Sequence, residues 1–144
     1  MITGVSSYSF SGAEKAGRID FIDIPAKAKD MGFEVLEFSS LSVPDGEKPL
    51  DFAKRLRDAC DHADITVANY TIKADFVNGV DVPPVQEPER LRSELEIAKA
   101  LGSPGMRHDA TWDFTGTFDQ ALPILAVGCL EVTKMAEDMG IKTM

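Results

Sequence analysis

Short apolar runs alternate with longer one-sided helical patterns along this chain. The runs predict strands at Ile2–Ser9, Val35–Phe38, Ile65–Tyr70 and Gly105–Asp109, and a fifth run opens at Ile141–Met144. They are spaced roughly 30 to 40 residues apart, which is the length that a strand, a crossover helix and a return loop require. Because the strands alternate with helices, the pattern predicts a parallel sheet.

Amphipathic patterns predict one helix in each interval. The helices lie at Asp23–Met31, Pro49–Ala63, Pro88–Leu101 and Phe118–Met139. The second helix shows the pattern clearly, because Phe52, Leu56 and Ala59 recur at the spacing of one helical face. At the start of the fourth helix, Thr117 and Gln120 form a capping box, and Pro123 predicts a kink or a short initial turn.

The order of elements places the chain in the α/β class. Four such units begin a (β/α)₈ barrel or make a small, open, doubly wound sheet. The 144 residues fall short of the roughly 250 that a closed barrel uses. The barrel interpretation therefore predicts a single domain, residues 1–144, that forms the N-terminal half of a TIM-type barrel and is truncated at its fifth strand.

Composition and motifs exclude several classes of partner. A net charge of -9 opposes contact with a nucleic-acid backbone. No apolar run approaches a membrane span, and the N-terminus lacks a secretion signal, so we expect a cytoplasmic protein. The two cysteines, Cys60 and Cys129, lie in helical patterns without CxxC spacing and predict buried free thiols. Neither GxGxxG nor a phosphate-binding P-loop sequence occurs.

The candidate site residues follow the predicted strands. In parallel α/β folds, ligands gather beyond the carboxyl ends of the strands. The side chains to consider there are Tyr8, Glu37, Asn69 and His108, with Trp112 in the loop that follows the fourth strand. A carboxylate such as Glu37 is costly to bury without a partner, so it serves a pocket, pairs with a cation such as Arg107, or faces solvent. Trp112 either covers a ligand or covers the helix layer.

Four segments suggest a family. They are Gly4–Phe10, Met31–Phe38, Ala100–Arg107 and Met139–Lys142. Together they resemble sugar phosphate isomerases and epimerases of the xylose isomerase-like barrel superfamily, and the order of elements matches over essentially the whole chain. This resemblance implies a metal-assisted proton transfer through an enediolate, with a sugar or sugar phosphate as the substrate.

The resemblance also implies where the site residues lie. It implies substrate contacts by Tyr8, Glu37, Asn69, His108 and Trp112, and no catalytic residue within this chain. The cofactor it implies is a divalent metal (Mn, Mg, Co or Zn) whose ligands begin beyond residue 144, so that this chain holds none and is expected to be inactive alone.

Two other functions and one assembly question stay open at this point. The chain could be a non-enzymatic α/β binding or interaction module, or a DNA-repair endonuclease of the AP-endonuclease type in the same superfamily, although its acidity opposes DNA. A half barrel would also leave two strand edges and an inner face, expected to be apolar, uncovered. This predicts either a homo-oligomer or a missing C-terminal half.

Overall fold

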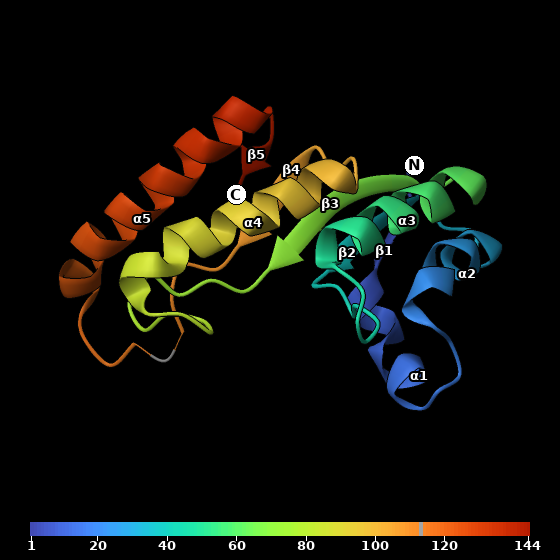
Figure 1. Cartoon of the computed structure of the whole chain (residues 1–144), viewed down its shortest axis with the longest axis horizontal. Helices are drawn as coiled ribbons and strands as arrows, with labels where there is room; N and C mark the ends of the chain where they lie inside the picture. The colour runs from blue at the N-terminus through green and yellow to red at the C-terminus, as the bar shows by residue number, and fades with distance from the viewer. Residues whose placement is uncertain (113) are drawn as a thin grey trace.

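Five parallel strands form one sheet in the chain order β1-β2-β3-β4-β5 (Figure 1). The structure is a computed structural model that describes residues 1–112 and 114–144. The strands are β1 (Gly4–Ser6), β2 (Val35–Ser39), β3 (Thr66–Ile72), β4 (Gly105–His108) and β5 (Lys142–Thr143). Each strand pairs with its sequence neighbour in parallel, so the parallel α/β sheet predicted from the sequence is confirmed.

The helices cover one face of this sheet (Figure 1). They are α1 (Ser11–Lys15), α2 (Ile24–Asp30), α3 (Pro49–His62), α4 (Glu87–Ala100) and α5 (Phe118–Met139), with short 3₁₀ helices at Ser7–Phe10, Phe21–Asp23 and Pro84–Gln86. From α2 to α5, each helix packs beside the next one along the chain. None of the helices in the described ranges is both long enough and apolar enough to cross a membrane.

The first strand is shorter than predicted. The sequence indicated a strand through Ser9, but the chain turns into a 3₁₀ helix at Ser7. Two serines explain the turn, because the Ser6 hydroxyl accepts from the Tyr8 N–H and the Ser7 hydroxyl accepts from the Ser39 N–H. Short polar side chains that bond to nearby backbone compete with strand pairing in this way.

The predicted capping box and the predicted interruption of α5 have different outcomes. The Thr117 N–H donates to Gln120 Oε1 at 2.8 Å, so the capping box is confirmed. The expected short initial turn at Pro123 is not found, because a single α-helix runs from Phe118 to Met139. Pro123 lies in the second turn, where its missing N–H removes one hydrogen bond near the helix start.

The core lies between the sheet and the helices. Leu36 and Phe38 of β2 are fully buried on the helix side, where Phe21 stacks 6.0 Å from the Phe38 ring and 6.1 Å from the Phe52 ring. Both cysteines are free thiols, as predicted; Cys60 is buried and Cys129 is half-buried. Burial raises the pKa of the Cys60 thiol to about 12, which keeps it protonated and unreactive.

The face of the sheet opposite the helices, called the open face below, is polar. Its side chains include Glu37 and Ser39 of β2, Asn69 and Thr71 of β3, and Arg107 of β4, and they alternate with the buried positions. The expectation of an apolar inner face is therefore wrong. The physical reason is the alternation of side chains along a strand, which sends the apolar positions of each run to the helices.

The exposed apolar surface lies on α5 instead. Residues 121–130 carry no charged side chain, yet only the side formed by Ala121 and Gly128 is buried. Leu122, Val127 and Leu130 remain about half exposed, at 45%, 63% and 55%. A helix that is apolar on all sides is usually covered on more than one side.

Candidate functional site

A hollow of about 560 Å³ lies at the carboxyl ends of the strands. Its volume falls within the roughly 300 to 1,000 Å³ of small-molecule sites. The side chains around it combine aromatic rings, hydroxyls and charges; they are Tyr8, Ser39, Ser40, Thr71, Ile72, Lys73, Arg107, Asp109 and Trp112. The sheet brings them together because parallel strands end at one edge.

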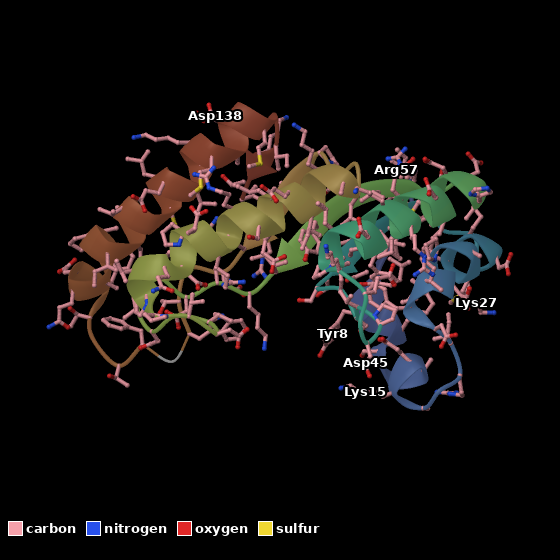
Figure 2. All side chains as sticks on the ribbon, in the orientation of Figure 1. Tyr8, Lys15, Lys27, Asp45, Arg57 and Asp138 are labelled. Carbon is pink, nitrogen blue, oxygen red and sulfur yellow. The ribbon has the colours of Figure 1, made fainter. Side chains whose placement is uncertain are left out.

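Two cations and two aromatic rings define the chemistry of this hollow. Arg107 Nη2 lies 2.8 Å from Asp109 Oδ1, which fixes the guanidinium at the end of β4. Lys73 Nζ lies 5.6 Å from the centre of the Trp112 ring, a cation–π distance. Tyr8 projects from the 3₁₀ helix after β1 and is 73% exposed (Figure 2). Exposed rings beside hydroxyls suit a ligand with both C–H and O–H groups.

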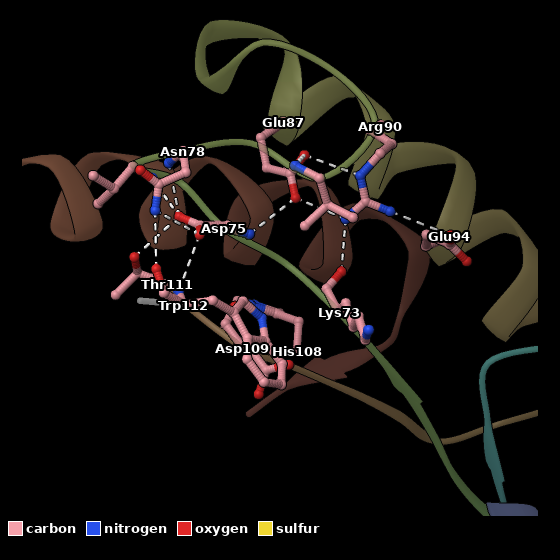
Figure 3. Close-up of polar contacts among 12 residues, drawn as sticks. Lys73, Asp75, Asn78, Glu87, Arg90, Glu94, His108, Asp109, Thr111 and Trp112 are labelled. Atoms are coloured by element: carbon pink, nitrogen blue, oxygen red, sulfur yellow. Dashed lines mark hydrogen bonds and ion pairs between the residues drawn. The ribbon is translucent and has the colours of Figure 1, made fainter. Parts of the chain in front are cut away.

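A buried carboxylate, Asp75, holds the loops beside the hollow in place (Figure 3). Its oxygens accept from the N–H groups of Val77, Asn78 and Trp112 at 2.8 to 3.0 Å and from the Thr111 hydroxyl at 3.0 Å. Burial alone would raise the pKa of Asp75, but the bonds from Asn78, Trp112 and Val77 outweigh it and lower that pKa to about 2. Asp75 is therefore ionised at neutral pH and ties the loop after β3 to the loop after β4.

A second buried carboxylate, Glu87, extends this network to α4. It is fully buried, accepts from the Asp75 N–H at 3.0 Å, and pairs with Arg90 Nη2 at 2.7 Å. The Arg90 side chain also donates to the Lys73 carbonyl at 2.6 Å, and its bond to Glu87 raises the pKa of the guanidinium. The backbone of Lys73 is thus fixed from α4 (Figure 3).

The five residues predicted to contact substrate fall into three groups. Tyr8 and Trp112 line the hollow. Glu37 and Asn69 lie on the open face, one pleat before Ser39 and Thr71, and Glu37 accepts from the Ser6 hydroxyl at 3.0 Å. His108 packs against the Phe76 ring edge-on at 5.8 Å and does not line the hollow. Neighbouring strand residues point to opposite faces, so Arg107 and Asp109 enter the hollow in its place.

Asn69 carries a polar atom that lacks a partner. Its Nδ2 donates to the Thr71 hydroxyl at 3.2 Å, whereas its Oδ1 is buried and accepts no hydrogen bond from the residues described. An unpaired buried acceptor costs about 1 to 3 kcal/mol. A ligand hydroxyl would reach this oxygen only after the side chains that cover it move, so it marks a local cost in β3 and not an open binding position.

The described side chains do not fit the divalent metal that the resemblance implies. Within residues 1–112 and 114–144, no three carboxylate, imidazole or thiol groups lie close enough to share a metal ion. Glu37 is engaged with Ser6, and Asp109 with Arg107. The described residues therefore offer no complete set of metal ligands.

Sequence reasoning missed Lys73, Asp75 and Glu87. Lys73 follows β3 directly, but the predicted strand ended at Tyr70, two residues before the actual end at Ile72. Continuing the alternation of apolar and polar residues from Tyr70 through Thr71 and Ile72 would have found it. Asp75 and Glu87 gave no such signal, because the bonds that join Asp75 to Glu87 and to Trp112 span 12 and 37 residues along the chain.

Solved structures share this fold, although no protein-family model and no curated protein matches the sequence. A D-psicose 3-epimerase structure, determined in the presence of D-fructose, has a TM-score of 0.75 at 13% identity, covering 99% of this chain and 51% of that one. An L-ribulose 3-epimerase has a TM-score of 0.66 at 20% identity, covering 99% and 48%. An AP endonuclease of family 2 from Brucella melitensis has a TM-score of 0.72 at 12% identity, covering 99% and 54%.

At these identities the likeness shows the fold. The chain has the parallel α/β fold of the xylose isomerase-like TIM barrels, and it spans about half the length of these solved structures. Of the two folds that the strand and helix pattern allowed, the barrel type is confirmed and the doubly wound sheet is not.

Proposed function

We propose that this chain forms the sugar-binding part of a sugar or sugar phosphate isomerase or epimerase. The hollow at the strand ends carries the proposal, because it combines two aromatic rings, three aliphatic hydroxyls and two cations in a barrel-type sheet. Solved structures with this fold include two epimerases of free sugars. In this proposal, residues 1–144 form a single domain that corresponds to the first half of a barrel.

The residues of this chain would bind and orient the substrate. Tyr8 and Trp112 would pack against the C–H face of the sugar, while Thr71 and Ser39 would bond its hydroxyls. Glu37 and Asn69 would meet hydroxyls that reach the open face, where each lies two residues before a residue that lines the hollow. His108 remains a proposed contact, although its ring packs against Phe76 in this structure.

The metal stays part of this proposal. When bound, a divalent ion would stabilise the negative charge of an enediolate. Its ligands are proposed to lie outside the described residues, and this chain alone is proposed to bind sugar without turning it over. We also propose that the protein is cytoplasmic, as expected from the sequence.

Binding of ketoses should be visible at the hollow. Titration with D-psicose, D-fructose or L-ribulose is expected to shift the ¹H–¹⁵N NMR signals of Thr71, Arg107 and the Trp112 indole. Replacing Thr71 by valine should weaken binding about 5-fold, because it removes one hydrogen bond worth about 1 kcal/mol.

A matched control separates this effect from a general change in the strand. Thr66→Val makes the same substitution at the exposed first residue of β3. This position is at the amino end of the strand, away from the hollow, so the ketose affinity should not change. Shifts that cluster away from the hollow, or none at tens of millimolar ketose, would contradict the proposed function. A pure binding module would show the same shifts and no turnover even when joined to a metal-binding half.

Self-association of the chain is also proposed. The contact surface is α5, where the exposed apolar side chains lie, and not the inner face of the sheet that the sequence suggested. An apolar helix side can pack against its own copy about a two-fold axis, which needs no second surface. We expect sedimentation equilibrium to show a dimer, and Val127→Glu to shift it to monomer. Lys134→Glu, an exposed change further along α5, is the control. A wild-type chain that stays monomeric at high concentration would contradict the proposal.

A further inference from the structure

The charge of the hollow differs from that of the whole chain. Lys73 and Arg107 line it against a single described carboxylate, Asp109, whereas the chain as a whole carries a net charge of -9. The two cations come from the ends of neighbouring strands, because Thr71 pairs with Arg107 across β3 and β4 and Lys73 lies two residues further. A local excess of positive charge in an acidic protein attracts anions to that place.

Arg107 has donors left for a second partner. Its guanidinium carries five N–H donors in a rigid fork. The ion pair to Asp109 uses Nη2, and the Arg107 side chain is still 50% exposed. Asp109 itself is only 15% exposed, so it holds the guanidinium from the protein side. The guanidinium N–H groups that Asp109 does not use are therefore left for a ligand in the hollow.

Lys73 is held beside the same space. Arg90 fixes its carbonyl, and the Trp112 ring lies 5.6 Å from its ammonium. The Trp112 backbone is fixed in turn by Asp75 at 3.0 Å. Among the residues that the structure describes, no carboxylate lies within 4.0 Å of the Lys73 ammonium. The Arg107 guanidinium and the backbone that carries Lys73 are therefore held before any ligand arrives, which lowers the cost of binding.

We propose that Lys73 and Arg107 form an anion subsite, so that the ligand of the hollow is a sugar carrying a phosphate or carboxylate group. The anion would accept bonds from the guanidinium fork and the ammonium, and the sugar hydroxyls would meet Thr71 and Ser39. The sugar part of this inference rests on the proposed function, whereas the anion part rests on the two cations alone.

The test compares neutral and anionic ligands by calorimetry and NMR on the full chain. D-Fructose 6-phosphate, D-gluconate or both should bind roughly 10- to 150-fold more tightly than D-fructose, as expected for charge-assisted bonds. A gain for the first identifies phosphate as the anion, and a gain for the second identifies carboxylate. Added salt should reduce the gain, because part of it is screened.

Charge variants locate the effect. Lys73→Met and Arg107→Met should each remove most of the gain for the anionic ligand, where the gain is taken against D-fructose binding measured on the same variant. Lys99→Met removes the same charge from the far end of α4 and should change neither affinity. Lys73 is exposed and has no described carboxylate partner, so Lys73→Met should keep the wild-type melting temperature. Arg107→Met leaves the largely buried Asp109 carboxylate without its partner and should lower the melting temperature.

The outcomes separate the anion subsite from the sugar site. Equal affinity for D-fructose and both anionic ligands overturns the subsite and leaves the proposed function standing. Binding of inorganic phosphate that Lys73→Met abolishes, with no binding of any neutral ketose, supports the subsite and overturns the proposed sugar site. A gain that survives both substitutions also overturns the subsite.

Discussion

Replacing Asp75 by alanine is expected to lower the free energy of unfolding by about 2 to 4 kcal/mol. The substitution leaves the N–H groups of Val77, Asn78 and Trp112 and the Thr111 hydroxyl without their acceptor. Each unpaired buried group costs about 1 to 3 kcal/mol, and the costs are not additive because the loops can relax and admit water.

Urea unfolding at pH 7 measures this loss. Asp138→Ala is the matched control, because Asp138 is exposed on α5 and should change the free energy of unfolding by less than about 0.5 kcal/mol (Figure 2). Asp75→Asn should fall between the two, since an amide keeps one acceptor oxygen. An Asp75→Ala variant as stable as the control would show that these bonds contribute nothing.

The same residue gives the effect a pH dependence. The folded-state pKa of Asp75 is about 2, below the ordinary value of about 3.9, so its stabilising effect is fully present above about pH 4. As pH falls from about 4 toward 2, the carboxylate takes up a proton and about 2 kcal/mol is lost. The stability difference between the wild type and Asp75→Ala should therefore narrow over this range.

Asp75 also connects stability to the proposed site. It fixes the backbone of Trp112, and through Glu87 and Arg90 the same network reaches the carbonyl of Lys73. Loosening this network should reduce ligand affinity in the molecules that remain folded, because part of the binding energy would then be used to order the two loops.

The fold could be predicted largely from periodicity. Four helices and the parallel order of the strands followed from apolar spacing, because burying one side of a helix or strand is the dominant local constraint. Gly32 and Gly140 follow the ends of α2 and α5, and both adopt left-handed backbone angles, with φ of 89° and 74°. The first strand was overestimated because one of the two serine bonds that end it joins Ser7 to Ser39, 32 residues away.

The candidate site could be predicted only in part. Tyr8 and Trp112 follow strands and line the hollow, as the rule for parallel sheets suggests. Which neighbour in the run Arg107–Asp109 faces the hollow depends on the register of β3 against β4, with Thr71 opposite Arg107. A shift of one residue reverses the faces, and one sequence does not fix that register.

Replacing Leu36 by alanine is expected to cost about 2 to 5 kcal/mol of stability without changing ligand affinity per folded molecule. Leu36 is fully buried on the helix side of β2, so truncation leaves a cavity in the core. Its neighbour Glu37 points to the open face, where glutamine can still accept from the Ser6 hydroxyl. Glu37→Gln should therefore change stability by less than about 1 kcal/mol while weakening sugar binding.

Urea unfolding and ketose titration of both variants test this division of roles. A Glu37→Gln protein with normal sugar affinity would remove Glu37 from the site, and a fully stable Leu36→Ala protein would contradict the packing of β2 against the helices.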